Sequence, residues 1–117
     1  MTFSISARCA KTGIMGIAIS SSSPAVAARC AHAMAGAGVV ASQNITDPAL
    51  GQAGLLLMAE GQSAEETLAR LLEGYAFADY RQLAIIDQFG GTASYSGAKA
   101  LGVFSTFEGD NCVAAGN

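Results

Sequence analysis

The alternation of polar and apolar residues at the start of the chain predicts a β-hairpin. Over residues 2–8 polar side chains occupy the even positions and apolar side chains the odd ones, which is the period of a half-buried strand. A turn at residues 11–13 ends in a glycine, and a nearly continuous apolar run follows over residues 14–19. Because this run continues into four serines at 20–23 and then Pro24, we expect the serines at the end of the second strand.

Two helices are predicted in the middle of the chain. Residues 47–48 combine an acidic N-cap with a proline at the first helical position, which predicts a helix over residues 49–60. Ser63 and Glu66 have the spacing of a capping box, in which each side chain accepts a hydrogen bond from the other residue's backbone. They predict a second helix that ends before Gly74.

The remaining segments are short and mostly strand-like. Apolar or alternating patterns predict strands over residues 39–41, 82–88, 92–96, 101–107 and 112–115, with a loop over 108–111. The alanine-rich residues 25–37 fit either a helix or a short pair of strands. This order of elements predicts an α+β fold, with antiparallel strands and helices gathered on one face.

Composition limits the classes of protein that the chain can belong to. Its 117 residues are 51% hydrophobic and only 13% charged, which fits one globular domain with part of its surface covered by another polypeptide. We therefore expect an oligomer or a second chain. A net charge of −3 with scattered basic residues argues against nucleic-acid binding.

Compartment and cysteine chemistry follow from the same composition. The sequence has no signal-peptide pattern and no apolar run of about 18 residues, so we expect a cytoplasmic protein without a membrane segment. Three cysteines, an odd number without CxxC spacing, argue against a disulfide framework and against structural zinc.

Hydroxyls and amides, and no recognisable triad, are the groups available for chemistry. His32 is the only histidine and no GxSxG motif is present. The glycine pairs do not match phosphate-binding loops, and the carboxylates and cysteines lack metal-ligand spacing, so we expect neither a metal nor an organic cofactor. Arg81 has two interpretations: it binds a substrate carboxylate, or it pairs with Asp79 or Asp87.

Seven separated segments carry a resemblance to a known family, in the order 2–7, 20–22, 38–44, 54–55, 81–82, 86–87 and 116–117. They resemble the bacterial family catalogued as domain of unknown function 1028, which is classed with the N-terminal-nucleophile (Ntn) hydrolase folds. The first hairpin is also similar to that of proteasome-type subunits. The resemblance implies a four-layer αββα sandwich, of which residues 1–117 supply about the N-terminal half of a single domain that a downstream second chain completes.

The resemblance implies hydrolysis of an amide bond in a small substrate, and two models of the nucleophile stay open. In one, Met1 is removed and the Thr2 hydroxyl is activated by its own α-amino group. In the other, the nucleophile follows Asn117 and is freed by self-cleavage of a precursor. An end at Asn117 also fits proteolysis or truncation, and similar proteins continue well past this residue.

Candidate site residues come from both models. The expected catalytic residues are Thr2, Ser21, Asn44 and Asn117. The expected substrate-binding residues are Ser20, Ser22, Ser42, Gln43 and Arg81. In the second model the groups that orient the substrate or stabilise an oxyanion are Ser20 to Ser22, Ser42, Gln43, Asn44 and Asn117. Because the hairpin returns the serines to the start of the chain, we expect the reactive group beside Thr2 and Ser20 to Ser22.

The sequence thus leads to two functional hypotheses. The first is an Ntn-type amide hydrolase that acts without a cofactor, as a heterodimer with the downstream chain of the same precursor and in a homo-oligomer of that heterodimer. The alternative is a non-catalytic Ntn-like module that assembles through its apolar faces and binds a ligand or a partner.

Overall fold

The predicted hairpin forms one side of the first of two sheets. The computed structural model describes residues 1–117, and in it β1 (Thr2–Arg8) pairs antiparallel with β2 (Met15–Ser21) in a register that sets Thr2 opposite Ser21. On its other side β1 pairs with β8 (Cys112–Gly116), which in turn pairs with β7 (Ser105–Gly109). We call this sheet, with the strand order β2-β1-β8-β7, sheet I.

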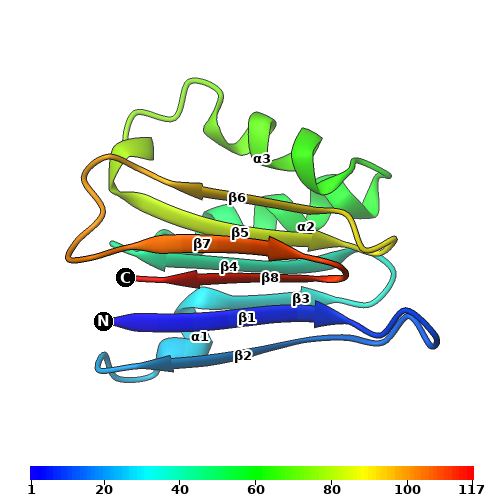
Figure 1. Ribbon diagram of the computed structural model, residues 1–117. Coiled ribbons are helices and arrows are strands. Elements are labelled where there is room, and N and C mark those ends of the chain that lie inside the picture. The colour runs from blue at the N-terminus through cyan, green and yellow to red at the C-terminus, as the bar shows by residue number, and fades with distance from the viewer.

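A second antiparallel sheet, sheet II, lies against the first. Its strand order is β3-β4-β5-β6, with β3 spanning Ala31–Met34, β4 Gly38–Asn44, β5 Arg81–Asp87 and β6 Thr92–Ser96. Strands β1 and β8 pack over β4 and β5, so that the two sheets are stacked face to face (Figure 1). All residues of β4 and β5 except Asn44 are buried, because both faces of sheet II are covered.

Helices cover the outer face of sheet II. Helix α2 (Pro48–Ala59) begins at the predicted Asp47 cap, and α3 (Ala64–Leu72) begins at the predicted capping box, in which both reciprocal hydrogen bonds are present. The ambiguous alanine-rich stretch contains both alternatives: a short helix, α1 (Val26–Cys30), leads directly into β3. A single 3₁₀ turn, η1 (Ala78–Tyr80), precedes β5.

Close packing of α2 depends on a glycine. A Cβ at Gly51 would lie 2.1 Å from a ring carbon of His32 on β3, so that only glycine allows the helix to approach this near. The His32 ring is buried and lies 3.2 Å from the Arg29 carbonyl. The single histidine therefore has a structural position in the helix layer.

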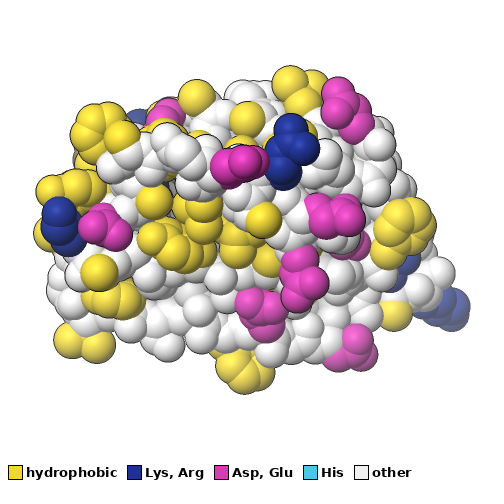
Figure 2. Space-filling model, turned by 90° about the horizontal axis from the view of Figure 1, so that it is seen from above, with side chains coloured by type: hydrophobic (Ala, Val, Ile, Leu, Met, Phe, Trp, Pro, Cys, Tyr) yellow, Lys and Arg dark blue, Asp and Glu magenta, His cyan; other side chains and the backbone are white.

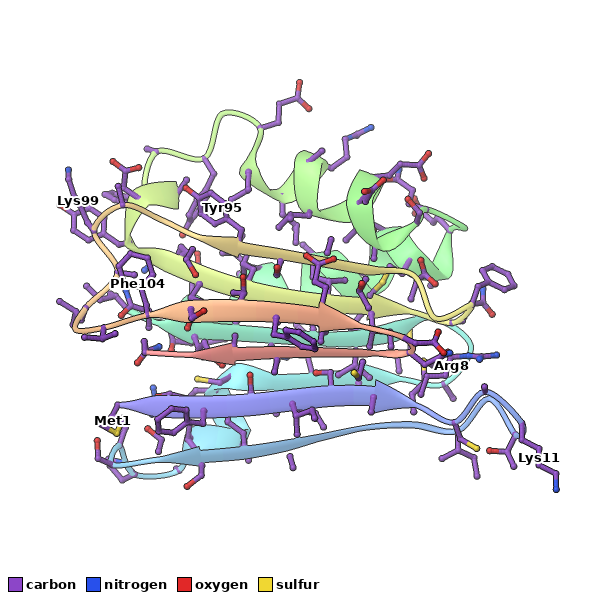
Figure 3. All side chains as sticks on the ribbon, in the orientation of Figure 1. Met1, Arg8, Lys11, Tyr95, Lys99 and Phe104 are labelled. Carbon is purple, nitrogen blue, oxygen red and sulfur yellow. The ribbon has the colours of Figure 1, made fainter.

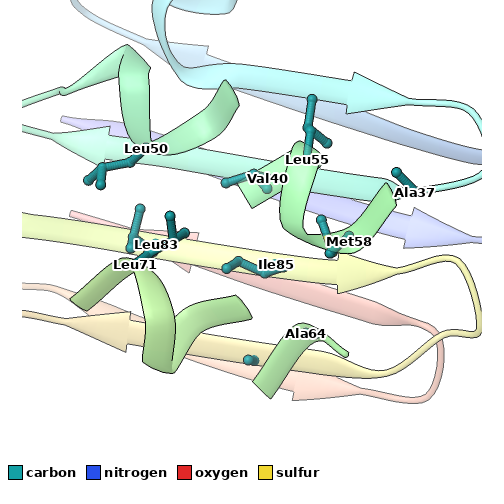
Figure 4. Close-up of a cluster of buried hydrophobic side chains, with 10 residues drawn as sticks. Ala37, Val40, Leu50, Leu55, Met58, Ala64, Leu71, Leu83 and Ile85 are labelled. Carbon is teal, nitrogen blue, oxygen red and sulfur yellow. The ribbon is translucent and has the colours of Figure 1, made fainter. Parts of the chain in front are cut away.

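Two hydrophobic clusters fill the two interfaces. The larger lies between the helices and sheet II and includes Val40, Leu55, Met58, Leu71, Leu83 and Ile85 (Figure 4). The smaller lies between the sheets and consists of Val39, Ala41, Ala84, Ile86, Val113 and Ala115. Alternate residues of β4 and β5 thus face opposite layers, as the period of a strand requires.

Strand β1 turns its polar face inward. Thr2, Ser4 and Ser6 are buried between the sheets, whereas the side chains of Phe3 and Ile5 lie on the outer face, 56% and 49% exposed. Phe107 of β7, 67% exposed, adds a further large apolar side chain to sheet I. No helix of residues 1–117 covers the outer face of sheet I, so that these residues form three layers, and the fourth layer of the expected sandwich is not among them.

The last hairpin differs from the prediction. The sequence pattern predicts a strand over 101–107 and a loop over 108–111, but β7 begins only at Ser105 and continues through Gly109. Residues 101–103 bend away from the sheet because Gly102 takes a left-handed φ of 71°. The tight turn is confined to Asp110 and Asn111, where Asn111 has a φ of 54°.

The surface carries little positive charge. Figure 2 shows acidic side chains spread between separate apolar groups on the face seen from above, with no stripe of basic residues. No helix of the structure is long and apolar enough to cross a bilayer.

Candidate functional site

A cavity of about 880 Å³ opens at the end of the sandwich where β1 begins and β2 ends. Its walls come from five parts of the chain: residues 1–3, residues 21–24, Asn44, residues 101–103 and Asn117. Figure 3 shows Met1 at this end of β1 and Arg8 and Lys11 at the opposite end. None of the lining residues has an ionisable side chain, so that, apart from the amino group of Met1, the cavity presents hydroxyls, amides and apolar groups.

Thr2 lies at the centre of this end because three strands meet there. Its hydroxyl oxygen is 2.9 Å from that of Ser21, the residue opposite it in the β1–β2 register. On the other side its backbone N–H donates to the Asn117 carbonyl over 3.2 Å, and the Asn117 N–H donates back to the Thr2 carbonyl over 3.0 Å. Thr2 is therefore held by backbone hydrogen bonds to Asn117 on one side and by a side-chain hydrogen bond to Ser21 on the other, with its side chain between the sheets.

A buried chain of amides lies behind Thr2. The Ser4 hydroxyl donates to Gln43 Oε1 over 2.7 Å, and Gln43 Nε2 donates to Gln82 Oε1 over 2.8 Å. The same Gln82 oxygen accepts from Asn117 Nδ2 over 3.1 Å. Gln43 and Gln82 have no exposed surface, so this network connects the interior of the sandwich to the cavity wall.

Gln82 is the residue of this network that sequence reasoning did not place in the site. Its Nε2 lies 2.9 Å from both Ser96 Oγ and the Gly116 carbonyl oxygen, so that one side chain bridges β5, β6 and β8. The available signal was an amide directly before the four apolar residues 83–86 of a strand. A glutamine in such a strand requires buried partners, and these lie on three different strands.

Asn44 lines the cavity with its side chain already engaged. Its backbone is left-handed, with a φ of 80°, which turns the end of β4. Its Nδ2 donates to the Tyr80 carbonyl, and its Oδ1 accepts from the Leu101 N–H over 3.1 Å. Asn44 therefore fixes the wall formed by residues 101–103.

Arg81 lies on the helix side of sheet II, outside the cavity. It donates to the Ile45 carbonyl and, through Nε, to the Tyr75 hydroxyl over 3.0 Å. That hydroxyl donates to Asp47 Oδ2 over 2.8 Å. Burial raises the pKa of Tyr75, and its hydrogen bond to the Asp47 carboxylate acts in the same direction. Neither Asp79 nor Asp87 forms an ion pair with Arg81; Asp79 lies 3.8 Å from Lys99 instead.

The other predicted site residues occupy four different places. Ser22 lines the cavity, together with Thr2 and Ser21. Gln43 lies behind it, in the amide network. Ser42 faces the helix layer, where its hydroxyl donates to the Asp47 carbonyl over 3.0 Å. Ser20 lies opposite Phe3 and is exposed, away from the cavity. The structure thus brings together Thr2, Ser21, Ser22, Asn44 and Asn117.

Metal-binding side chains do not gather in the structure. No three histidine, cysteine, aspartate or glutamate side chains converge anywhere in residues 1–117. The site described above consists of neutral groups and backbone.

Comparisons with known proteins place this geometry in a family. A family model described as a family of unknown function, DUF1028, matches residues 2–117. The crystal structure of a protein from Silicibacter pomeroyi, described with the same family model, superposes with a TM-score of 0.94 at 27% sequence identity. The match covers 99% of this chain and 52% of that one, so the chain spans about half the length of this relative. No curated protein matches the sequence.

Proposed function

The chain belongs to the family of unknown function DUF1028, and we propose that it is an Ntn-type amide hydrolase whose nucleophile is the Thr2 hydroxyl. One observation carries the proposal. A buried threonine at the start of a central strand places its hydroxyl in a cavity of about 880 Å³ that is lined by serine, threonine and asparagine side chains. Removal of Met1 would give this threonine a free α-amino group beside its own hydroxyl.

The proposed base is that α-amino group. Its ordinary pKa is about 8, so roughly a tenth of the amine is unprotonated at pH 7, and this form accepts the hydroxyl proton. The Asn117 carbonyl, which accepts from the Thr2 nitrogen over 3.2 Å, would hold the amine in place. No metal or organic cofactor takes part in the proposed reaction.

The proposed reaction proceeds in two steps. Thr2 Oγ1 attacks the substrate's amide carbon, its proton passes to the α-amino group, and the carbonyl π pair moves to oxygen. Collapse of this intermediate breaks the C–N bond, and the leaving amine takes the proton. Water then attacks the resulting ester, with the α-amino group again as base, and releases the acid together with the free hydroxyl.

The uncharged lining points to a neutral substrate. A carboxylate or phosphate beside the scissile bond would enter a site with no lysine, arginine or histidine in its wall. Phe3, Leu101 and Val103 offer apolar contact next to the hydroxyls. The proposed substrate is therefore a small amide whose groups near the scissile bond are uncharged.

The model with a nucleophile after Asn117 has weaker support. Cleavage by the asparagine side chain requires Nδ2 to attack its own carbonyl carbon, but Nδ2 donates to the buried Gln82 oxygen over 3.1 Å. The half of the Silicibacter pomeroyi protein that matches belongs to a chain about twice as long. The hydrogen bond disfavours cleavage by the asparagine side chain, and self-cleavage after Asn117 by attack of the following residue stays a prediction.

We further propose the four-layer αββα sandwich, in which a second helical layer covers sheet I. Its support is the outer face of that sheet, where Phe3 and Phe107 are 56% and 67% exposed. Burying large aromatic side chains is strongly favourable, so we expect another layer of structure to pack against this exposed face. The additional length of the Silicibacter pomeroyi chain would be enough to supply it.

The test is the state and reactivity of Thr2 in the full-length protein. The intact mass is expected to show loss of Met1, and a β-lactone is expected to add covalently to Thr2, located by peptide mass spectrometry. Thr2→Ser should keep the labelling and Thr2→Ala should abolish it. Thr12→Ala, in the exposed hairpin turn, is the matched control. An unlabelled Thr2 in protein that lacks Met1 would exclude the proposed hydrolase.

A further inference from the structure

The carbonyl oxygen of Met1 is held by two hydrogen-bond donors. The Ser21 hydroxyl donates to it over 3.0 Å, and the backbone N–H of Ser22 donates to it over 3.1 Å. The amino group of Met1 in turn donates to the Ser22 hydroxyl over 3.3 Å. Met1 is thus bound by residues at the end of β2, although its side chain is largely exposed.

The hydrogen atoms of this cluster can be assigned from its contacts. A serine hydroxyl has one hydrogen to donate and accepts through its lone pairs. The Ser21 hydroxyl donates its hydrogen to the Met1 carbonyl, and the oxygen of the same hydroxyl accepts from the Ser23 N–H over 3.1 Å. The remaining contact, 2.9 Å to Thr2 Oγ1, therefore has the Thr2 hydroxyl as donor. Ser21 touches both the proposed nucleophile and a carbonyl oxygen.

We propose that Ser21 Oγ and the Ser22 N–H form the oxyanion hole of the site and that Met1 occupies it until it is removed. This inference rests on the proposed function of Thr2. The Met1 carbonyl stands where the carbonyl of a substrate's acyl group binds, beside the hydroxyl that attacks it. Loss of Met1 leaves both donors without their acceptor and next to Thr2.

The geometry meets the requirements of an oxyanion hole. Such a site needs donors that are fixed before the reaction and lie about 3 Å from the oxygen that becomes negative. The β1–β2 pairing sets Thr2 opposite Ser21, so the hydroxyl donor and the nucleophile belong to one rigid register. The second donor is a backbone group and cannot rotate away. No cationic side chain lines the cavity to serve instead.

The two donors act on the charge that the reaction creates. When Thr2 Oγ1 bonds to the acyl carbon, the electron pair of the C=O π bond moves to oxygen. Ser21 Oγ–H and the Ser22 N–H then hydrogen-bond to that oxyanion, without giving up a proton. On collapse the pair returns to the carbonyl, the C–N bond breaks, and the leaving nitrogen takes its proton from the Thr2 ammonium group. Removing one such donor lowers the rate about 10²–10³-fold.

The experiment uses the full-length protein with an N-terminal extension whose removal by a site-specific protease leaves Thr2 first. A β-lactone is added to protein with and without the extension, and the rate of Thr2 acylation is followed by mass spectrometry. We compare the parent with Ser21→Ala, Ser21→Thr and the matched control Ser94→Ala. Ser94 also donates a hydroxyl hydrogen bond, to Glu108 over 2.6 Å, but lies outside the cavity.

The expected result is a loss in the maximal acylation rate. Ser21→Ala should lower it by about 10²-fold or more, with little change in the lactone concentration that gives half-maximal rate, because the donor acts in the transition state. Ser21→Thr should recover the rate to within about tenfold of the parent, because it restores the hydroxyl donor. If Ser21→Ala does not fold, Ser21→Cys replaces it: its weak S–H donor should cost at least about tenfold.

Two outcomes separate this inference from the function on which it rests. Acylation of Thr2 in Ser21→Ala or Ser21→Cys at the parental rate overturns the oxyanion hole and leaves the hydrolase standing. Absence of Thr2 acylation in the parent after the extension is removed overturns the hydrolase itself. In addition, equal acylation before and after removal of the extension overturns both the role of Met1 and the α-amino base, because the extension also blocks that amine.

Discussion

The hydroxyl of Ser4 donates a hydrogen bond to the side-chain oxygen of Gln43 across the two sheets, over 2.7 Å. Ser6, two residues further along β1 on the same face, is also buried, but its hydroxyl has no hydrogen-bond partner. The strand therefore carries two buried serines that differ in one respect, whether the second sheet offers an acceptor.

This difference predicts opposite effects of the same substitution. Ser4→Ala should lower the free energy of unfolding by about 1–2 kcal/mol, because it leaves Gln43 Oε1 without its donor. Ser6→Ala should leave stability unchanged or raise it by up to about 1 kcal/mol, because a buried hydroxyl without a partner is lost. Urea unfolding of both variants in the full-length protein measures the difference, and equal losses would contradict the prediction.

Gln82 is predicted to contribute most to the amide network. Gln82→Met keeps the length of the side chain but leaves Gln43 Nε2, Asn117 Nδ2 and the Gly116 carbonyl without their partner. We expect the free energy of unfolding to fall by about 2–4 kcal/mol. Gln88→Met, near the other end of the sandwich, is the control and should stay within about 0.5 kcal/mol of the parent. A similar loss of unfolding free energy in both variants would show that the introduced methionine causes the effect, and not the broken hydrogen bonds of Gln82.

The Tyr75 hydroxyl predicts a dependence of stability on alkaline pH. Its pKa is raised in the folded protein, first by burial and then by the hydrogen bond to Asp47. A raised pKa contributes stability that is present below the unfolded value of about 10 and is lost as pH rises through the folded value. Tyr75→Phe should therefore be less stable than the parent near neutral pH, by about 1–2 kcal/mol, because Arg81 loses a partner.

The measurement is thermal or urea unfolding between about pH 9 and pH 11. The difference in the free energy of unfolding between the parent and Tyr75→Phe should become smaller as pH rises across this range, because only the parent loses the contribution of the hydroxyl. Tyr80 and Tyr95 are present in both proteins and cancel in the comparison. A gap that widens with pH would have the wrong sign for a raised pKa.

The open face of sheet I predicts how residues 1–117 behave when expressed by themselves. With Ile5 and Phe107 on an uncovered sheet, residues 1–117 should aggregate or bind a hydrophobic dye. The double substitution Ile5→Thr and Phe107→Thr should reduce the aggregation.

Phe89→Thr provides the control for that experiment, since Phe89 is 80% exposed but lies in the turn between β5 and β6. It should leave the aggregation as it is. A monodisperse parental fragment that unfolds cooperatively and binds no dye would show that sheet I needs no cover.

Local patterns predict the elements of this fold better than their contacts. The hairpin and both helix caps follow from signals within a few residues, and the hairpin alone brings Thr2 to Ser21. Local patterns do not predict which face of β1 is buried. The alternation of polar and apolar residues gives the period of the strand, but the choice of buried face depends on Gln43 and Gln82 in the opposite sheet. For the same reason Gln82 stands out in the sequence only as a polar residue in a strand.

The role of Arg81 is equally hidden from local patterns. Its charged neighbours in the sequence, Asp79 and Asp87, are not its partners. The left-handed turn at Asn44 presents the Ile45 carbonyl to the guanidinium, and Tyr75 reaches it from the end of the helix layer. Contacts of this kind are set by tertiary structure, which one sequence does not reveal.

The filling between the sheets changes in character along the strands: amides and hydroxyls near Thr2, aliphatic side chains from Val39 to Ile86 at the far end. Mutations at the two ends therefore have different consequences for evolution. Changes in the aliphatic end alter stability alone, while changes among the polar groups alter both what is bound and how firmly the sheets are joined. Lineages that diverge in ligand therefore need compensating changes in the aliphatic end.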